Sequence, residues 1–178
     1  MKTDVHVRPA SMADAEALYR ARISPAAAAG TMAVPSMSPE QFSAQLKGLV
    51  EDHRHHTFAA ELEGRVVGMG NLTVGRGRRS HVGSIGMYVA DDACGRGVGT
   101  AIMKALVDIV DNWLLLKRLE LEVYPDNEVA IRLYEKFGFC REGVKRSAAV
   151  KDGRLVDIIM MGRVRDTGTI ASGDRPSL

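Results

Sequence analysis

The chain lacks most of the features that would assign a protein of 178 residues to a class at once. Its two cysteines, Cys94 and Cys140, have no metal-ligand spacing and indicate a reduced, cytoplasmic protein. The formal net charge of +2 gives no strong electrostatic case for a nucleic-acid partner. No apolar run approaches the ~20 residues that cross a bilayer, so we expect no membrane partner.

The N-terminal region also lacks the apolar core of a signal peptide, because residues 1–10 carry charged and polar side chains throughout. The apolar share of 46% is ordinary for a globular protein, and the length fits one domain. We expect that domain to cover residues 1–165. The Gly-, Ser- and Thr-rich segment 166–178 is expected to form a flexible tail.

Apolar periodicity predicts an α/β fold, a mixed sheet of about seven strands flanked by about four helices. The expected strands are 5–8, 57–62, 66–74, 81–89, 118–124, 140–150 and 155–164. Helices are expected from Ser11 to Pro25, from Ser38 onward, after Gly99, and from Asn127 to Gly138. Segment 25–38, small, polar and proline-bearing, is interpreted as a loop. The third helix is expected to pack through Ile102, Leu106, Ile109, Val110 and Trp113.

The stretch from Met87 to Ala105 is the most informative part of the chain. An apolar strand ends near Val89, and Gly95, Gly97 and Gly99 then lead into the third helix. Alternate glycines let the backbone approach a ligand closely. The free N–H groups at a helix start favour anions. This turn therefore predicts a phosphate or pyrophosphate site.

Three cofactor classes compete for that turn. A dinucleotide fingerprint needs a third glycine where the chain has Thr100, although Glu120 lies about where a ribose-binding acid would be wanted. A Walker-type loop needs Gly-Lys-Ser/Thr, which is absent. The pyrophosphate turn for acetyl-CoA fits the spacing Gly97-x-Gly99 and also fits the downstream sequence.

Two motifs together resemble the GNAT N-acetyltransferase superfamily. The first has Arg or Gln, two residues, Gly, one residue, then Gly or Ala; here Cys94 takes the first position before Gly97 and Gly99. The second matches without departure, at Asn127, Ala130, Leu133, Tyr134, Gly138 and Phe139. The expected strand order is also similar, from residue 5 to about 164. The resemblance implies an acetyl-CoA-dependent enzyme with no metal.

Finer resemblances concern the acceptor. Segments 78–82, 111–114 and 127–139 look like a bacterial branch that acetylates free L-amino acids, and 119–139 also looks like the ribosomal-protein alanine acetyltransferases. They imply a small primary amine, an amino acid first and a protein N-terminus second. A non-catalytic acyl-CoA-binding module is the alternative from another class. The resemblance also makes a homodimer plausible.

The superfamily resemblance further implies where acetyl-CoA binds. Backbone groups near Met87 and Val89 would pair with the pantetheine arm, and one N–H there would meet the oxyanion. The other residues expected at the cofactor are Gly95, Arg96, Gly97, Val98, Gly99 and Thr100 at the pyrophosphate, with Asn127, Ala130 and Tyr134 beside the arm.

Tyr134 is expected to be the general acid, since a phenol with pKa ~10 is protonated at neutral pH and can donate to the leaving thiolate. Glu122 is the first candidate for the general base. His81, Ser84, Asp157 or an ordered water are the alternatives. Many members place a glutamate on the strand at 84–87, and none is present here.

Other conspicuous residues are given lesser roles. The cluster His53, His55 and His56 lacks the spacing of a helical metal site and is expected to bind none. The basic loop with Arg76, Arg78 and Arg79 lacks aromatic neighbours for nucleic acid. It is expected to be solvated or to contact a substrate carboxylate or a CoA phosphate. Cys94 lies where a phosphate turn could lower its thiol pKa, but without a partner base it is interpreted as structural.

Overall fold

The computed structural model describes residues 4–34 and 36–165, and its strands form one seven-stranded sheet in the order β1-β2-β3-β4-β5-β7-β6. The predicted tail at 166–178 lies outside the described residues. The strands are β1 (Val5–Pro9), β2 (His55–Leu62), β3 (Arg65–Val74), β4 (Val82–Val89), β5 (Arg118–Val123), β6 (Cys140–Lys151) and β7 (Arg154–Val164). The α-helices are α1 (Ala15–Arg22), α2 (Pro25–Gly30), α3 (Pro39–Glu51), α4 (Val98–Asp108) and α5 (Glu128–Lys136).

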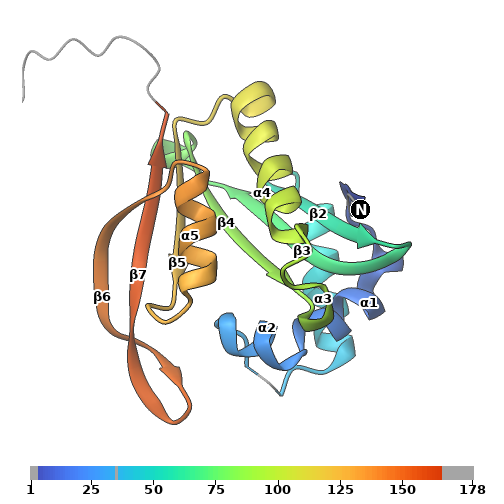
Figure 1. Ribbon diagram of the computed structural model, residues 1–178. Coiled ribbons are helices and arrows are strands. Elements are labelled where there is room, and N and C mark those ends of the chain that lie inside the picture. Colours follow the sequence, from blue (N-terminus) through green and yellow to red (C-terminus); the bar gives the residue numbers. More distant parts are fainter. Residues whose placement is uncertain (1–3, 35, 166–178) are drawn as a thin grey trace, which may run out of the picture.

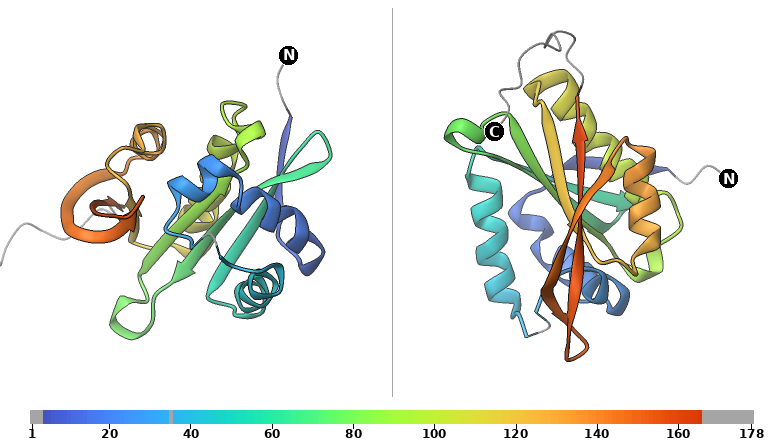
Figure 2. Two further views of the ribbon diagram at one scale, coloured as in Figure 1. Left: turned by 90° about the horizontal axis from the view of Figure 1, so that it is seen from below. Right: turned by 90° about the vertical axis from the view of Figure 1, so that its left-hand side faces the viewer.

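Helices cover both faces of the sheet (Figures 1 and 2). α1 and α3 pack on one face around Leu18, Phe42 and Leu46, while α4 and α5 pack on the other around Ile102 and Ile131. The alternation of a strand divides its side chains between these two cores. The expected α/β fold with a mixed sheet is thus confirmed.

The prediction of a loop over residues 25–38 is wrong for its first half, because α2 forms there. Pro25 stands in its first turn, where a missing N–H costs nothing. The carboxylate of Asp91 accepts hydrogen bonds from the amides of Ala26 (2.9 Å) and Ala27 (3.1 Å). An N-terminal cap supplied by a residue so distant in sequence leaves no local signal.

The prediction of the apolar face of the third helix, α4, is also partly wrong. Ile102, Leu106 and Val110 are buried as expected, but the side chain of Trp113 is 77% exposed. The chain changes from α4 to a π-helical turn at Ile109–Leu114. The wider turn moves later residues off the 3.6-residue face, so Trp113 leaves the core.

The contact between β4 and β5 is the irregular feature of the sheet. These parallel strands pair only at Val82–Arg118, Gly83–Leu119 and Ser84–Glu120. β4 pairs with β3 along its length, and β5 pairs with β7 along its own. Beyond Ser84 and Glu120 the two strands therefore diverge, as Figure 1 shows, and leave an opening within the sheet.

Close packing of β3 against α4 gives a stability prediction. A Cβ on Gly70 would lie 2.3 Å from Cγ2 of Ile102, so Gly70→Ala should reduce the free energy of unfolding by about 1–3 kcal/mol. A Cβ on Gly48, within α3, would meet nothing within 4 Å, so Gly48→Ala should stabilise by about 0.5–1 kcal/mol. Urea unfolding of both variants checks this, and equal stabilities would contradict it.

Candidate functional site

The glycine turn lies after the diverging end of β4. Gly95 and Gly97 have φ values of +74° and +86°, which favour glycine, and Gly97 forms the N-cap of α4. Among the described residues, no acceptor is found for the amides of residues 95–100. Successive free N–H groups at a helix N-terminus can hold a diphosphate.

Three of the predicted cofactor elements meet at Gly99. A Cβ at this position would lie 3.2 Å from Cδ2 of Leu133 and 3.5 Å from Cε of Met87. The start of α4, the diverging part of β4 and the middle of α5 are therefore in contact. This brings the turn and the strand predicted for the pantetheine arm into one continuous surface.

Tyr134 lies on α5 beside this surface and is 8% exposed. Its ring packs against Phe139 with centroids 6.1 Å apart. Burial raises the pKa of its phenol to about 12. No hydrogen-bond partner for the hydroxyl is found in the part of the chain that the structure describes, yet the oxygen is not sealed from solvent. The group is protonated at neutral pH and free to donate.

Asn127 has a local structural task. Its Oδ1 accepts a hydrogen bond from the amide of Ala130 at 3.2 Å and so caps α5. Its Nδ2 lies 3.3 Å from where a Cβ on Gly30 would stand. The residue thus joins the start of α5 to the end of α2, and places both next to the opening.

Arg96 and Cys94 are less available than the sequence suggests. The guanidinium of Arg96 forms an ion pair with Glu63 on the β2–β3 turn. The thiol of Cys94 donates to the carbonyl of Ala90 at 3.5 Å. Burial, and then the negative charges of Asp91 and Asp92, raise the pKa of that thiol. The pKa is thus raised and not lowered as the turn alone could do, because burial and then the two acids disfavour the thiolate.

The candidate bases lie in different surroundings. Glu122 is exposed and forms an ion pair with Lys145 of β6. The carboxylate of Asp157 accepts the amide of Ser147 at 2.9 Å, within the irregular part of β6. His81 is exposed immediately before β4, at the end remote from the turn. Of these, Glu122 lies on the strand that borders the opening.

Ser84 and Glu120 form the last pair before the strands diverge. The Ser84 hydroxyl is 3.5 Å from Oε1 of Glu120, and Arg79 binds the same carboxylate oxygen at 2.5 Å. Leu119 and Leu121 belong to the core under α4 and α5, so Glu120 and Glu122 face the opposite side of the sheet. Glu122, the candidate base on β5, therefore faces the side of α1 and α3.

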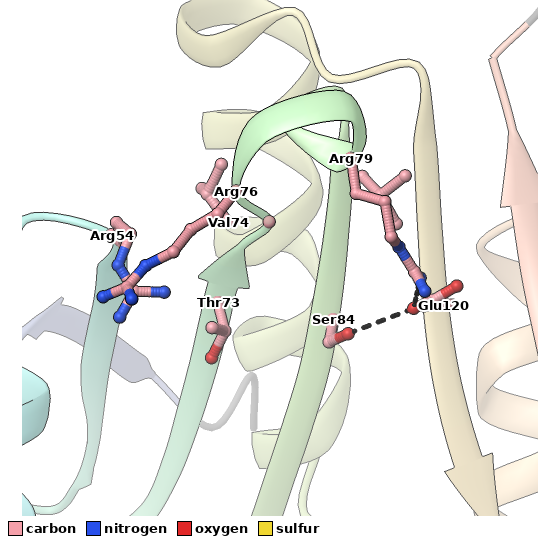
Figure 3. A pocket seen from close by; sticks show the side chains of 9 residues that line it. Arg54, Thr73, Val74, Arg76, Arg79, Ser84 and Glu120 are labelled. Atoms are coloured by element: carbon pink, nitrogen blue, oxygen red, sulfur yellow. Dashed lines mark hydrogen bonds and ion pairs between the residues drawn. The ribbon is translucent and has the colours of Figure 1, made fainter.

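A cavity of about 320 Å³ opens on that same side (Figure 3). Arg54, Arg76, Arg79, Ser84 and Glu120 contribute to its lining, together with residues of β3. The sequence draws attention to the basic loop but not to Arg54, which lies in the histidine run. No local pattern reveals the cavity, because its walls come from three strands, the residue before β2 and the loop.

The described residues contain no group of three or more His, Cys, Asp and Glu side chains that could hold a metal ion. His55 instead bonds Thr73 at 3.0 Å across the β2–β3 pair. No helix in the described ranges has both the length and the apolar character needed to span a membrane.

Comparison with known proteins identifies the family. The model of the acetyltransferase (GNAT) family matches residues 25–139. The chain is 34% identical over 166 residues to the L-amino acid N-acetyltransferase AaaT of Escherichia coli K12, covering 92% of this chain and 99% of that protein. The chain belongs to the GNAT acetyltransferase family.

Two further relatives agree with this assignment. The phosphinothricin N-acetyltransferase of Alcaligenes faecalis is 27% identical over 113 residues, which cover 62% of this chain and 57% of that protein. A GNAT-family structure from Kribbella flavida superposes with a TM-score of 0.77 at 27% identity, covering 90% of this chain and 98% of that one. The opening and the glycine turn thus belong to a GNAT N-acetyltransferase fold, whose family uses acetyl-CoA.

The environment of Cys94 gives a second prediction. In a Cys140→Ser background, the pH midpoint for alkylation of Cys94 by iodoacetamide should lie above the usual thiol value of about 8.5. Asp92→Asn should lower that midpoint, because it removes one of the two charges that disfavour the thiolate. A midpoint below about 8.5, unchanged by Asp92→Asn, would contradict this account.

Proposed function

We propose that the protein transfers the acetyl group of acetyl-CoA to the primary amine of a small substrate, an L-amino acid, by direct attack in a ternary complex. The observation that carries this proposal is the opening between β4 and β5, which ends at a turn of free amides. In the proposal, the cofactor lies along the strands that no longer pair, with its phosphates at the anion site. Similarity to AaaT supports the choice of an amino acid.

Different groups of the chain would bind different parts of acetyl-CoA. In the proposal, the amides from Gly95 to Thr100, including those of Val98 and Gly99, hold the pyrophosphate, with Arg96 reaching a phosphate after leaving Glu63. Unpaired backbone near Met87 and Val89 binds the pantetheine arm as an added strand. Asn127 and Ala130 border the arm from the start of α5. A backbone N–H of β4 stabilises the oxyanion.

Proton transfer is assigned to two side chains. Tyr134 donates to the thiolate as it leaves, and its raised pKa keeps the phenol protonated in the resting enzyme. Glu122 accepts the proton of the attacking ammonium, directly or through water. Ser84 and Glu120 are the last paired residues of β4 and β5. Glu122 lies two residues beyond Glu120, so it borders the opening where the strands have just diverged.

A second acceptor class remains a prediction: the α-amine of a protein N-terminus, as the sequence resemblance suggests. The cytoplasmic location, the homodimer and the single domain over residues 1–165 are also predictions that accompany the proposal. Each can be examined once acetyl transfer has been measured.

An acceptor panel tests the proposed function. Release of free thiol from acetyl-CoA should occur with L-amino acids and should be far slower with polyamines, aminoglycosides and an Ala-starting peptide. A colorimetric thiol assay provides the measurement. Faster turnover of the peptide than of the amino acids would identify a protein N-terminus as the acceptor. Binding of acetyl-CoA without turnover of any amine would indicate a non-catalytic module.

Tyr134→Phe tests the acid. It should lower kcat by about 10²-fold, at the lower end for a lost general acid, while calorimetry shows unchanged CoA affinity. With a pKa of about 12, Tyr134 should cause no fall in wild-type kcat between pH 8 and 10. Tyr88→Phe is a control: its buried hydroxyl bonds the carbonyl of Leu18 at 3.2 Å, so stability should fall and kcat should not. Full kcat in Tyr134→Phe would exclude this acid.

A further inference from the structure

The 320 Å³ cavity is lined by the apolar side chains of Val74 and Val82, by hydroxyl groups and by a basic rim. Thr73 and Ser84 are paired in register on β3 and β4 and form part of its floor. Arg54, Arg76 and Arg79 contribute three guanidinium groups to its lining, against one carboxylate from Glu120. The lining therefore carries a net positive charge and favours an anionic ligand.

The three arginines differ in their partners. Arg54 binds the carboxylate of Asp52 at 2.6 Å, and Arg79 binds Glu120 at 2.5 Å. For Arg76, no carboxylate or hydrogen-bond acceptor is found within residues 4–34 and 36–165. Figure 3 shows its side chain extended toward Arg54. Both guanidinium groups line the cavity and carry the same charge, so an anion bound between them would be attracted by both.

The pKa of His55 responds to the positive charge of the same arginines. Burial lowers the pKa of its imidazole, Arg54 and Arg76 lower it further, and Asp52 opposes them. The neutral ring bonds Thr73 on the cavity floor at 3.0 Å. The floor thus offers the hydroxyl groups of Thr73 and Ser84, which can donate to an anion bound to the arginines, while His55 supports Thr73 from outside the lining.

The position of the cavity decides which anion it suits. Ser84 precedes Gly86 by two residues, or about 7 Å along β4, and both face the side of α1 and α3. An acceptor whose amine enters the opening near Gly86 would extend its remaining groups toward Ser84. The glycine turn follows the other end of β4, a strand of eight residues or about 26 Å. CoA phosphates bound there lie far from the basic rim.

We propose that this cavity binds the carboxylate of the acceptor and that Arg76 is the residue that selects for it. The inference rests on the proposed function and narrows its substrates to anionic and zwitterionic amines. Polyamines and aminoglycosides carry several positive charges and are repelled by the same rim. A guanidinium can bind a carboxylate through two parallel hydrogen bonds, which fixes the direction in which the amine points.

A matched pair of variants and a matched pair of substrates test the proposal. Arg76→Gln removes the unpaired guanidinium. Arg78→Gln removes the same charge from the same loop, but Arg78 does not line the cavity. Each protein is assayed with alanine, leucine, glutamine and phenylalanine in the L form and with their carboxamides, which lack only the carboxylate charge.

Wild type and Arg78→Gln should prefer each acid over its carboxamide in kcat/KM. Arg76→Gln should raise KM for the acids by about tenfold or more, as expected when a charged hydrogen bond is lost, and abolish the preference with little change in kcat. A preference retained in Arg76→Gln would overturn the proposal.

Calorimetry without acetyl-CoA separates this inference from the proposed function. Weaker binding of L-leucine by Arg76→Gln than by Arg78→Gln supports the carboxylate site, even where no amino acid is turned over and the proposed function has failed. Equal binding by the two variants overturns the site whether or not amino acids are acetylated.

Discussion

The interrupted pairing of β4 and β5 is the constraint on which the rest of the molecule depends. Parallel strands in a continuous sheet would satisfy each other's N–H and C=O groups, and here they do so only as far as Ser84 and Glu120. The polar backbone beyond that point needs another partner. An extended ligand arm can supply one, so a local loss of sheet pairing becomes a binding surface.

The two faces of the sheet divide the proposed reaction between them. Met87 points into the side of α4 and α5, where Gly99 and Leu133 meet it. Ser84, Glu120 and Glu122 belong to the other face, beside the cavity with the arginines. The cofactor and the acceptor would therefore approach the opening from opposite sides. Alternation along two strands is sufficient to produce that separation.

Much of the fold could be predicted because its signals are local. Alternation gives the strands, and the two tight hairpin turns have consecutive positive φ values at Glu63-Gly64 and Asp152-Gly153, as residue type suggests. The glycine turn and Tyr134 were likewise recognisable from motifs. α2, the exposure of Trp113 and the cavity could not be predicted, since each depends on residues distant in sequence or on a π-helical turn.

The short helix α2 shows how an opening in a sheet can be held without closing it. Its first amides bind Asp91, directly after β4, and their hydrogen bonds lower the pKa of that carboxyl. Its last residue, Gly30, lies against Asn127, which caps α5 after β5. α2 thus connects the chain on both sides of the opening at the end where the strands no longer pair. Because Asp91 accepts from Ser24 as well as from Ala26 and Ala27, one carboxylate fixes the direction of the helix. The separation of β4 and β5 is therefore set by contacts outside the sheet, which leaves the backbone along the opening available to a ligand.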